Sequence, residues 1–350
     1  MLKKTGIHIN ILLLMGTIFC CLLLLFLGEG LCRVFTDINC QRTSRDLLIE
    51  NGYGTSIGNA KNFEAISFGA KVYTDEFGFR VPRNGGTSLS NCESAILILG
   101  DSVGFGVGLE EAETAAGLLR KEIPSTKIYN SSVIGYYTYD YKNVIESFLP
   151  LHEEVKTVYL LFCLNDLSPY STMCFDENNK ISIETDGFFK KIITKIGKNS
   201  LILRMNMFLR AHSKLYIFFR GILAQGEGLF LIEDNSLYSE RNKAIFLEKM
   251  RYIADISVYL KKKNIPFTVI IMPYEYQLRT HDEKLMIPQQ KLTEFFNDEG
   301  INYIDAVSEF RNSETASKDF YLAYDPTHFS KKGNEILSNI IVRDIANRGN

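Results

Sequence analysis

The sequence predicts an α/β fold: a three-layer, flavodoxin-like α/β/α sandwich with about five parallel strands, preceded by one N-terminal transmembrane helix. The first observation is that apolar, strand-like runs alternate with helical patterns from residue 94 onward. Such alternation is typical of βαβ units around a parallel sheet. The second is an uncharged stretch of 18 residues, from Ile11 to Gly28, which is about the length that a helix needs to span a bilayer.

Each strand of the predicted sheet is a short apolar run followed by a helical pattern. The run AILIL (95–99) contains no polar residue, as expected for a strand that is buried on both faces. Further strands are expected at 127–133, 157–164, 266–272 and 301–307, and helices at 112–123, 139–149, 240–263, 289–300 and 331–348. This order predicts helices on both faces of one parallel sheet.

The N-terminal apolar stretch is interpreted as an uncleaved membrane anchor within residues 1–33. A cleaved signal peptide is the alternative, but its apolar region usually has about 7 to 15 residues and is followed by a small-residue cleavage site. The residues EGLCRVF that follow Gly28 contain no such site. Because Lys3 and Lys4 precede the stretch, the positive-inside rule predicts a cytoplasmic tip and an extracytoplasmic domain.

Two regions lie outside the regular alternation. Residues 34–93 are a polar approach segment, in which TDEFGFRVP (74–82) is interpreted as a loop on the surface of the domain at 94–350. An irregular insertion is expected at about 168–239. Within it, residues 187–225 contain eight Lys or Arg and no Asp or Glu. That composition is compatible with an anionic membrane surface, with a lid over the site, or with amphipathic helices packed on the core.

The composition of the chain argues against some classes of function. The formal net charge of -2, from 39 basic and 41 acidic residues, gives no reason to expect a nucleic-acid partner. The histidines and carboxylates do not have metal-ligand spacing, and no GxxxxGK[ST] motif is present, so neither a metal nor another cofactor is predicted. The seven cysteines are scattered, which argues against a disulfide scaffold and leaves one or two bridges open.

Ser102 stands at the end of the AILIL strand, in the sequence GDSVGFG. In open α/β sheets this edge binds ligands, so Ser102 is a candidate nucleophile. The alternative is that Asp101 and Ser102 only cap the next helix.

A serine nucleophile needs a base. The predicted topology places His328 at the same edge of the sheet as Ser102. His328 lies in YDPTHFSKKG, between the last strand and the last helix, with Asp325 three residues earlier. The Asp325 carboxylate would fix the tautomer of the imidazole, whose other nitrogen would face Ser102. The alternative is an Asp-Pro turn leading into a helix that is capped by Ser330.

Acyl transfer also requires donors for a negatively charged oxygen. Gly135 follows the second strand and offers a backbone N-H, and Asn165 follows the third strand and offers a side-chain amide. Each of these two residues alone is better explained as an ordinary loop residue. Together, however, Ser102, Gly135, Asn165 and His328 follow four predicted strands along one sheet edge.

With these residues in order, the chain resembles the SGNH, or GDSL-type, hydrolase family over about residues 94–345. The four blocks are GDSVGFG, the VIG segment, CLND and DPTH. The resemblance implies Ser102 as nucleophile with Asp325 and His328, and an oxyanion hole formed by the Ser102 and Gly135 N-H groups and the Asn165 amide. Cys163 departs from the pattern, because the third block usually has glycine there. As a buried thiol it is not expected to be a nucleophile itself.

Together with the predicted anchor, the resemblance predicts a membrane-anchored serine esterase or O-acyltransferase that acts outside the cytoplasm. The expected substrate, an acylated cell-surface glycan, is implied by the resemblance only. A lipid ester is the main enzymatic alternative, because of the anchor at 11–28 and the basic, apolar stretch at 187–225. A non-catalytic protein that uses the fold to bind a polymer or an envelope complex is the third.

Overall fold

The structure is a computed structural model and describes residues 2–49, 53–54, 57–85, 94–167, 172–175, 181–184, 200–224, 237–280 and 282–348. All of the candidate catalytic and oxyanion residues lie within these ranges. Outside them lie His281, residues 86–93 of the approach segment and much of the predicted insertion, including 187–199 of its basic stretch.

One mixed sheet of eight strands runs through the domain, in the order β12-β11-β8-β6-β7-β5-β4-β3. Its parallel strands are β6 (Ala95–Gly100), β7 (Lys127–Asn130), β8 (Val155–Phe162), β11 (Phe267–Ile271) and β12 (Asn302–Asp305). Numbered along the chain, these five lie in the order 2-1-3-4-5, which is the flavodoxin-like arrangement. The predicted fold class is confirmed.

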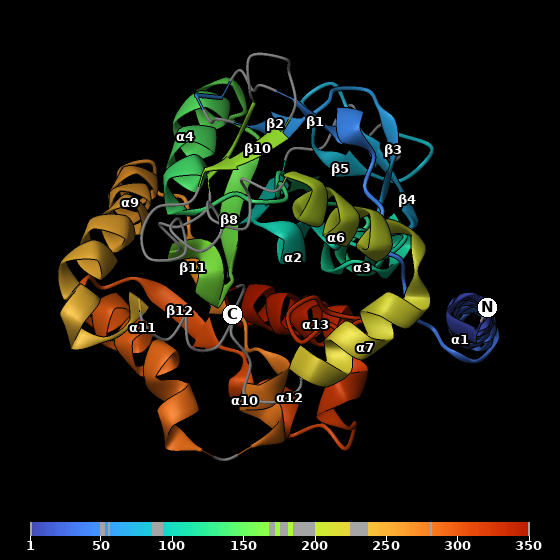
Figure 1. Ribbon diagram of the computed structural model, residues 1–350. Coiled ribbons are helices and arrows are strands. Elements are labelled where there is room, and N and C mark those ends of the chain that lie inside the picture. The colour runs from blue at the N-terminus through green and yellow to red at the C-terminus, as the bar shows by residue number, and fades with distance from the viewer. Residues whose placement is uncertain are drawn as a thin grey trace.

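Helices cover both faces of the parallel part of the sheet (Figure 1). Every residue of β6 and β11 is therefore buried, which explains why their sequences are continuous apolar runs. On one face, α3 (Ala115–Glu122) packs against α13 (Lys331–Arg348), and on the other, α4 (Thr138–Phe148) packs against α9 (Lys243–Lys262). Further helices in the described part of the domain are α2 (Ser102–Phe105), α10 (Glu275–Arg279), α11 (Ile287–Asp298) and α12 (Val307–Arg311).

The approach segment is part of the same sheet. It supplies β3 (Glu64–Ser67), β4 (Ala70–Thr74) and β5 (Arg80–Val81), which continue the sheet from β7 in antiparallel pairs. A separate two-stranded sheet is formed by β1 (Leu48–Ile49) and β2 (Gly58–Asn59). The interpretation of 74–82 as a surface loop is wrong, because Arg80 is completely buried and Phe79 nearly so.

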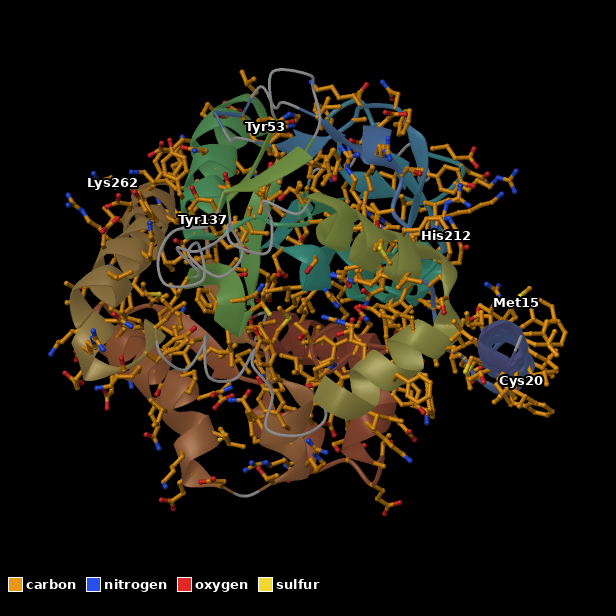
Figure 2. The ribbon with its side chains drawn as sticks, viewed as in Figure 1. Met15, Cys20, Tyr53, Tyr137, His212 and Lys262 are labelled. Carbon is orange, nitrogen blue, oxygen red and sulfur yellow. The ribbon has the colours of Figure 1, made fainter. Side chains whose placement is uncertain are left out.

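The N-terminal helix α1 (Leu2–Phe35) contains a candidate membrane span, Leu12–Phe35, that is long and apolar enough to cross a bilayer. Its side chains, including those of Met15 and Cys20, project from a helix set beside the domain (Figure 2). The described parts of the insertion are β9 (Thr172–Phe175), β10 (Ile181–Glu184), α6 (Ser200–His212) and α7 (Lys214–Ala224). Of these, α7 packs against α1 (Figure 1).

Candidate active site

The carboxyl ends of β6, β7 and β8 meet at one edge of the sheet. The strand register pairs Gly100 of β6 with Leu161 of β8, and Ile98 of β6 with Asn130 of β7. Ser102 follows β6 by two residues and opens the helix α2. The candidate nucleophile therefore stands at the edge where open α/β sheets bind ligands.

Asp101, rather than Ser102, caps the helix. Its Oδ1 accepts a hydrogen bond from the Val103 N-H at 2.8 Å, as expected of an N-cap carboxylate. The Ser102 hydroxyl is 3.2 Å from Asp101 Oδ2 and 2.9 Å from Nε2 of His328. The shorter contact is the one that a base would use.

His328 lies between Ser102 and Asp325, although Ser102 and His328 are 226 residues apart in the chain. Its Nδ1 is 2.8 Å from Asp325 Oδ2. Because an ionised carboxylate only accepts hydrogen bonds, Nδ1 carries the proton and Nε2 is left to accept from the serine hydroxyl. The three side chains that the sequence predicts as nucleophile, base and orienting carboxylate therefore lie in that order within hydrogen-bond distance.

The loop that carries this pair is held by its own backbone. Asp325 Oδ1 accepts from the N-H groups of Thr327 and His328, at 3.0 and 3.1 Å. The carbonyl of Pro326 accepts from the Glu275 N-H at 2.9 Å, which ties the loop to the segment after β11. One carboxylate oxygen thus shapes the turn while the other orients the imidazole.

Burial and pairing act in opposite senses on the pKa values of this pair. Burial alone would raise the pKa of Asp325, but the charge of His328 and its hydrogen bonds lower it to about 2. Burial alone would lower the pKa of His328, but the charge and hydrogen bond of Asp325 raise it above its ordinary 6.5. Asp325 is therefore ionised at neutral pH, and His328 is a stronger base than a free imidazole.

Gly135 lies in a turn beside the end of β6. The Val133 N-H donates to the Gly100 carbonyl at 3.2 Å, and the Tyr136 N-H closes the turn on the Val133 carbonyl at 3.1 Å. The φ angle of Gly135 is +90°, a region that favours glycine. The structure places the residue at the expected edge, with its backbone in a conformation that a larger residue would strain.

Asn165 follows β8 in a short 3-10 turn, Leu164–Leu167. Its Oδ1 accepts a hydrogen bond from the hydroxyl of Tyr274 at 3.3 Å. An amide whose oxygen is held in this way has its Nδ2 directed to the other side, where it can donate. Tyr274, which follows β11, is a positioning residue that sequence reasoning missed, because its contact depends on the register between β8 and β11.

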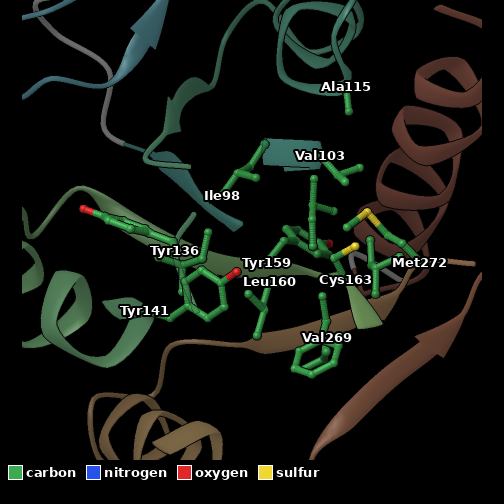
Figure 3. Close-up of a cluster of buried hydrophobic side chains, with 14 of the residues drawn as sticks. Ile98, Val103, Ala115, Tyr136, Tyr141, Tyr159, Leu160, Cys163, Val269 and Met272 are labelled. Carbon is green, nitrogen blue, oxygen red and sulfur yellow. The ribbon is translucent and has the colours of Figure 1, made fainter. Parts of the chain in front are cut away.

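Cys163 is a core residue. Its side chain is 1% exposed, and Figure 3 shows it within a cluster of buried apolar side chains, on the side of Met272. Its Sγ donates to the Tyr274 hydroxyl at 3.9 Å, and its N-H donates to Asp166 Oδ2 at 3.0 Å. Asp166 therefore stabilises the turn that contains Asn165. The Cys163 thiol is buried in the core and is not accessible to a substrate.

Phe68 is a second residue that sequence reasoning missed. With Gly69 it forms the two-residue turn between β3 and β4, and both have positive φ angles, +47° and +86°. Such turns favour Asn-Gly, and a phenylalanine there is strained. The Phe68 ring meets the His328 ring edge-on, with centroids 5.4 Å apart. The signal in the sequence is a Phe-Gly pair where Asn-Gly is usual, and strained residues cluster at functional sites.

Arg80 binds the backbone at the end of the helix that Ser102 opens. Its guanidinium donates to the carbonyls of Phe105 and Gly106, at 2.5 and 2.6 Å, and to that of Leu109 at 2.5 Å. Burial lowers the pKa of Arg80 to about 10, so it is still charged at neutral pH. These carbonyls belong to the last residue of α2 and to the turn that follows it, so Arg80 binds acceptors at the end of the Ser102 helix.

The other described histidines lie elsewhere. His152 stacks on Phe148 and lies 2.9 Å from a Glu154 oxygen, and His212 ends α6. Within the described part of the chain, no group of three His, Cys, Asp or Glu side chains is placed to hold a metal ion.

Comparisons with known proteins give fold neighbours among solved structures. A lipase/acylhydrolase from Enterococcus faecalis has 14% identity and a TM-score of 0.42, over 73% of this chain and 96% of that one. A lipolytic protein of the G-D-S-L family from Veillonella parvula has 9% identity and a TM-score of 0.40, over 71% and 97%. An acetylxylan esterase from Geobacillus stearothermophilus has 12% identity and a TM-score of 0.40, over 72% and 94%.

No protein-family model and no curated protein matches the chain. The chain's own geometry, with Ser102 at 2.9 Å from His328 and His328 at 2.8 Å from Asp325, is the strongest evidence at the site. In its strand order and in the four blocks that its sheet brings to one edge, the chain resembles the SGNH, or GDSL-type, hydrolases.

Proposed function

We propose that the protein is a membrane-anchored serine esterase or O-acyltransferase that acts on an ester of an extracytoplasmic substrate. The observation that carries the proposal is the continuous line of contacts from Ser102 through His328 to Asp325. A serine hydroxyl is a poor nucleophile until a base takes its proton. This line supplies the base and the carboxylate that orients it.

The reaction proceeds through an acyl-serine. As Ser102 Oγ attacks the acyl carbonyl carbon, its proton moves to Nε2 of His328, and the imidazolium is stabilised by Asp325. The carbonyl oxygen becomes an oxyanion, for which the N-H groups of Ser102 and Gly135 and the Nδ2 of Asn165 are the proposed donors. Collapse of this intermediate breaks the ester bond, and His328 returns the proton to the leaving alcohol.

The second half of the reaction decides between hydrolysis and transfer. His328 takes a proton from water or from a sugar hydroxyl, whose oxygen then attacks the acyl-serine. The ester to Ser102 breaks, and the proton returns to Ser102 Oγ. The same side chains serve both outcomes, so the acceptor alone distinguishes an esterase from an acyltransferase.

Two substrate classes have support. An O-acylated cell-surface glycan is the class that the family resemblance favours. A lipid ester is favoured by the position of α7, which packs against the candidate membrane span in α1. Turnover of acetylated saccharides, compared with turnover of long-chain lipid esters, separates the two. If only long-chain esters react, the glycan proposal is wrong.

The enzymatic proposal is tested by labelling the full chain with a fluorophosphonate, which reacts with activated serines. We expect labelling of the unaltered protein and none of Ser102→Ala. Ser131→Ala is the matched control, because its hydroxyl donates to the Ile98 carbonyl near the same strand and has no contact with His328. Equal labelling of the folded unaltered and Ser102→Ala proteins would remove Ser102 as nucleophile, and no labelling of either would favour a non-catalytic binding protein.

A further inference from the structure

The α6–α7 hairpin, residues 200–224, is joined to the membrane helix by a side-chain cap. The carboxylate of Glu29 in α1 accepts hydrogen bonds from the Ser213 hydroxyl at 2.8 Å and from the N-H groups of Lys214 and Leu215, at 3.2 and 3.0 Å. These N-H groups belong to the first turn of α7, which has no intrahelical partner for them. The anchor therefore caps α7.

Further contacts fix the same corner, residues 212–215. Arg33 of α1 donates to the His212 carbonyl at 2.7 Å, and the Lys214 ammonium donates to the Thr36 carbonyl at 3.1 Å. At Gly28 the two helices approach so closely that a Cβ atom would lie 3.2 Å from Leu215 Cδ2. The corner is thus held at one height along α1.

The corner contacts α1 at the end of its apolar stretch. Glu29 is the first charged residue after Lys4, and the 18 residues from Ile11 to Gly28 extend about 27 Å as a helix. This length matches the hydrocarbon thickness of a bilayer of roughly 30 Å. If α1 spans the membrane, Glu29 and the corner lie in the headgroup layer.

From this corner, α7 runs to the catalytic loop. Leu215 and Gly221 are separated by about 9 Å along the helix axis. A Cβ on Gly221 would lie 2.4 Å from Tyr324 Cβ, and the ring of Phe218 meets that of Tyr324 at 5.0 Å. Tyr324 directly precedes Asp325. The catalytic loop is therefore reached from the membrane anchor through one short helix.

The hairpin presents apolar side chains to its surroundings, and its residues 200–224 include four Lys or Arg. Phe208, next to the corner, is 62% exposed, and Phe219 on α7 is 53% exposed. The sequence from 187 to 225, which includes the hairpin, contains no acidic residue. Exposed aromatic residues among basic ones are typical of helices in the interface of an anionic bilayer.

We propose that the α6–α7 hairpin lies in the headgroup layer of the bilayer that α1 spans, and that it forms the wall between this bilayer and the catalytic loop. The substrate ester is then taken up at the membrane surface. The occupant of the exposed hairpin face is a bilayer that contains anionic lipid. This inference rests on the membrane anchoring in the proposed function and adds where the substrate is met.

The chain contains no tryptophan, so a single introduced tryptophan reports on one position. We use full-length Phe208→Trp in lipid nanodiscs that contain phosphatidylcholine and phosphatidylglycerol, with bromine atoms placed near the headgroups as quenchers. Phe19→Trp, in the middle of α1, is the reference for membrane insertion. Leu151→Trp is the matched control, because Leu151 is 79% exposed and precedes β8, at the sheet edge opposite the site.

We expect Phe208→Trp to be quenched at least about twofold more than Leu151→Trp, and Phe219→Trp to repeat the result from α7. Replacing phosphatidylglycerol with phosphatidylcholine should reduce quenching at Phe208→Trp. The inference is overturned if Phe19→Trp is quenched by deeply brominated lipid while Phe208→Trp and Phe219→Trp match Leu151→Trp. If Phe19→Trp itself is not quenched, the anchoring in the proposed function fails, and the inference fails with it.

Discussion

At the residue scale, catalysis depends on the protonation state of His328. The base must be neutral to accept the Ser102 proton, and Asp325 raises the pKa of His328 above 6.5 while its own pKa is about 2. Asp325 is therefore ionised near neutral pH. The loss of activity at acidic pH is then expected to follow the protonation of the His328 imidazole.

We expect kcat/KM to rise with pH through the raised pKa of His328 and thus to reach half of its plateau above pH 6.5. In Asp325→Asn the carboxylate charge is lost and only Asp101 still opposes the effect of burial on the pKa of His328, so this midpoint should move to lower pH. Turnover should fall by about 10⁴-fold, because the amide favours the wrong tautomer. The measurement is ester hydrolysis from pH 4 to 9. A midpoint that stays in place in Asp325→Asn would contradict the pairing.

Asn165→Ala should lower kcat by about 10²- to 10³-fold, which is the usual loss for one oxyanion donor. KM should change little, because the oxyanion forms only in the transition state. A change below about threefold would remove Asn165 from the oxyanion hole.

Tyr274→Phe removes the hydroxyl that holds the Asn165 amide but leaves the amide itself. We expect a smaller loss of kcat, roughly 2- to 12-fold, as for one ordinary hydrogen bond. In the Asn165→Ala background the same change should have no further effect on kcat. Equal losses from Tyr274→Phe in both backgrounds would show that Tyr274 acts independently of Asn165.

At the element scale, neither the β3–β4 hairpin nor the turn after α2 was predictable from the periodicity of the sequence. The hairpin consists of short edge strands whose pairing depends on β5 and β7 rather than on its own periodicity. The Ser67 carbonyl accepts from the Gly108 N-H at 3.2 Å, which joins the hairpin to the turn after α2. Such long-range contacts leave no local signal, whereas β6 and α13 were predictable because burial and helical periodicity are local.

Phe68 allows the strain and the function of this hairpin to be separated. Phe68→Asn and Phe68→Ala both remove the ring that meets His328, so both should lower kcat/KM. Asparagine tolerates positive φ, so Phe68→Asn should be more stable than Phe68→Ala by about 1 kcal/mol. Urea unfolding of the full chain in detergent micelles measures the difference. Unchanged kcat/KM in both variants would show that the Phe68 ring has no influence on the base.

Arg80 connects the same hairpin region to the nucleophile. Arg80→Lys keeps the positive charge but cannot reproduce three directed hydrogen bonds to the carbonyls of the turn after α2. We expect a loss of about 1 to 3 kcal/mol in the free energy of unfolding, the usual cost of leaving a buried acceptor unsatisfied. The rate of fluorophosphonate labelling at Ser102 should fall in the folded protein. Lys121→Arg, on the exposed side of α3, is a control that should change neither value.

At the scale of the whole molecule, the parallel arrangement of the five strands was predictable, because each strand–helix–strand unit places two strands parallel in the same sheet. The extension of the sheet by β3, β4 and β5 was not, because these strands are short and lie in a segment of mixed polarity. Topology predicted that Ser102 and His328 lie at one sheet edge, and the spacing of Asp325 to His328 completed the candidate set. The complete burial of Arg80 was not predictable, because arginine is mostly exposed in folded proteins.

The predicted orientation of the chain is testable with single cysteines in a chain whose own cysteines are replaced by serine. Leu151→Cys should react with a membrane-impermeant maleimide in intact cells, because the positive-inside rule places the domain outside. Leu2→Cys should react only after the cells are permeabilised. The reverse pattern would place the domain in the cytoplasm and contradict the proposed compartment.

If α1 spans the bilayer as proposed, the Glu29 cap makes the distance of the active site from the membrane depend on the lipid as well as on the protein. Because α7 is fixed to α1 at the end of the apolar stretch, the catalytic loop cannot move relative to the anchor without breaking these hydrogen bonds. A thicker bilayer draws the anchor in, and a thinner one tilts it. In the proposed membrane-anchored protein, membrane thickness would then set the distance between Ser102 and the headgroups, and we expect activity in bilayers of increasing acyl-chain length to pass through an optimum.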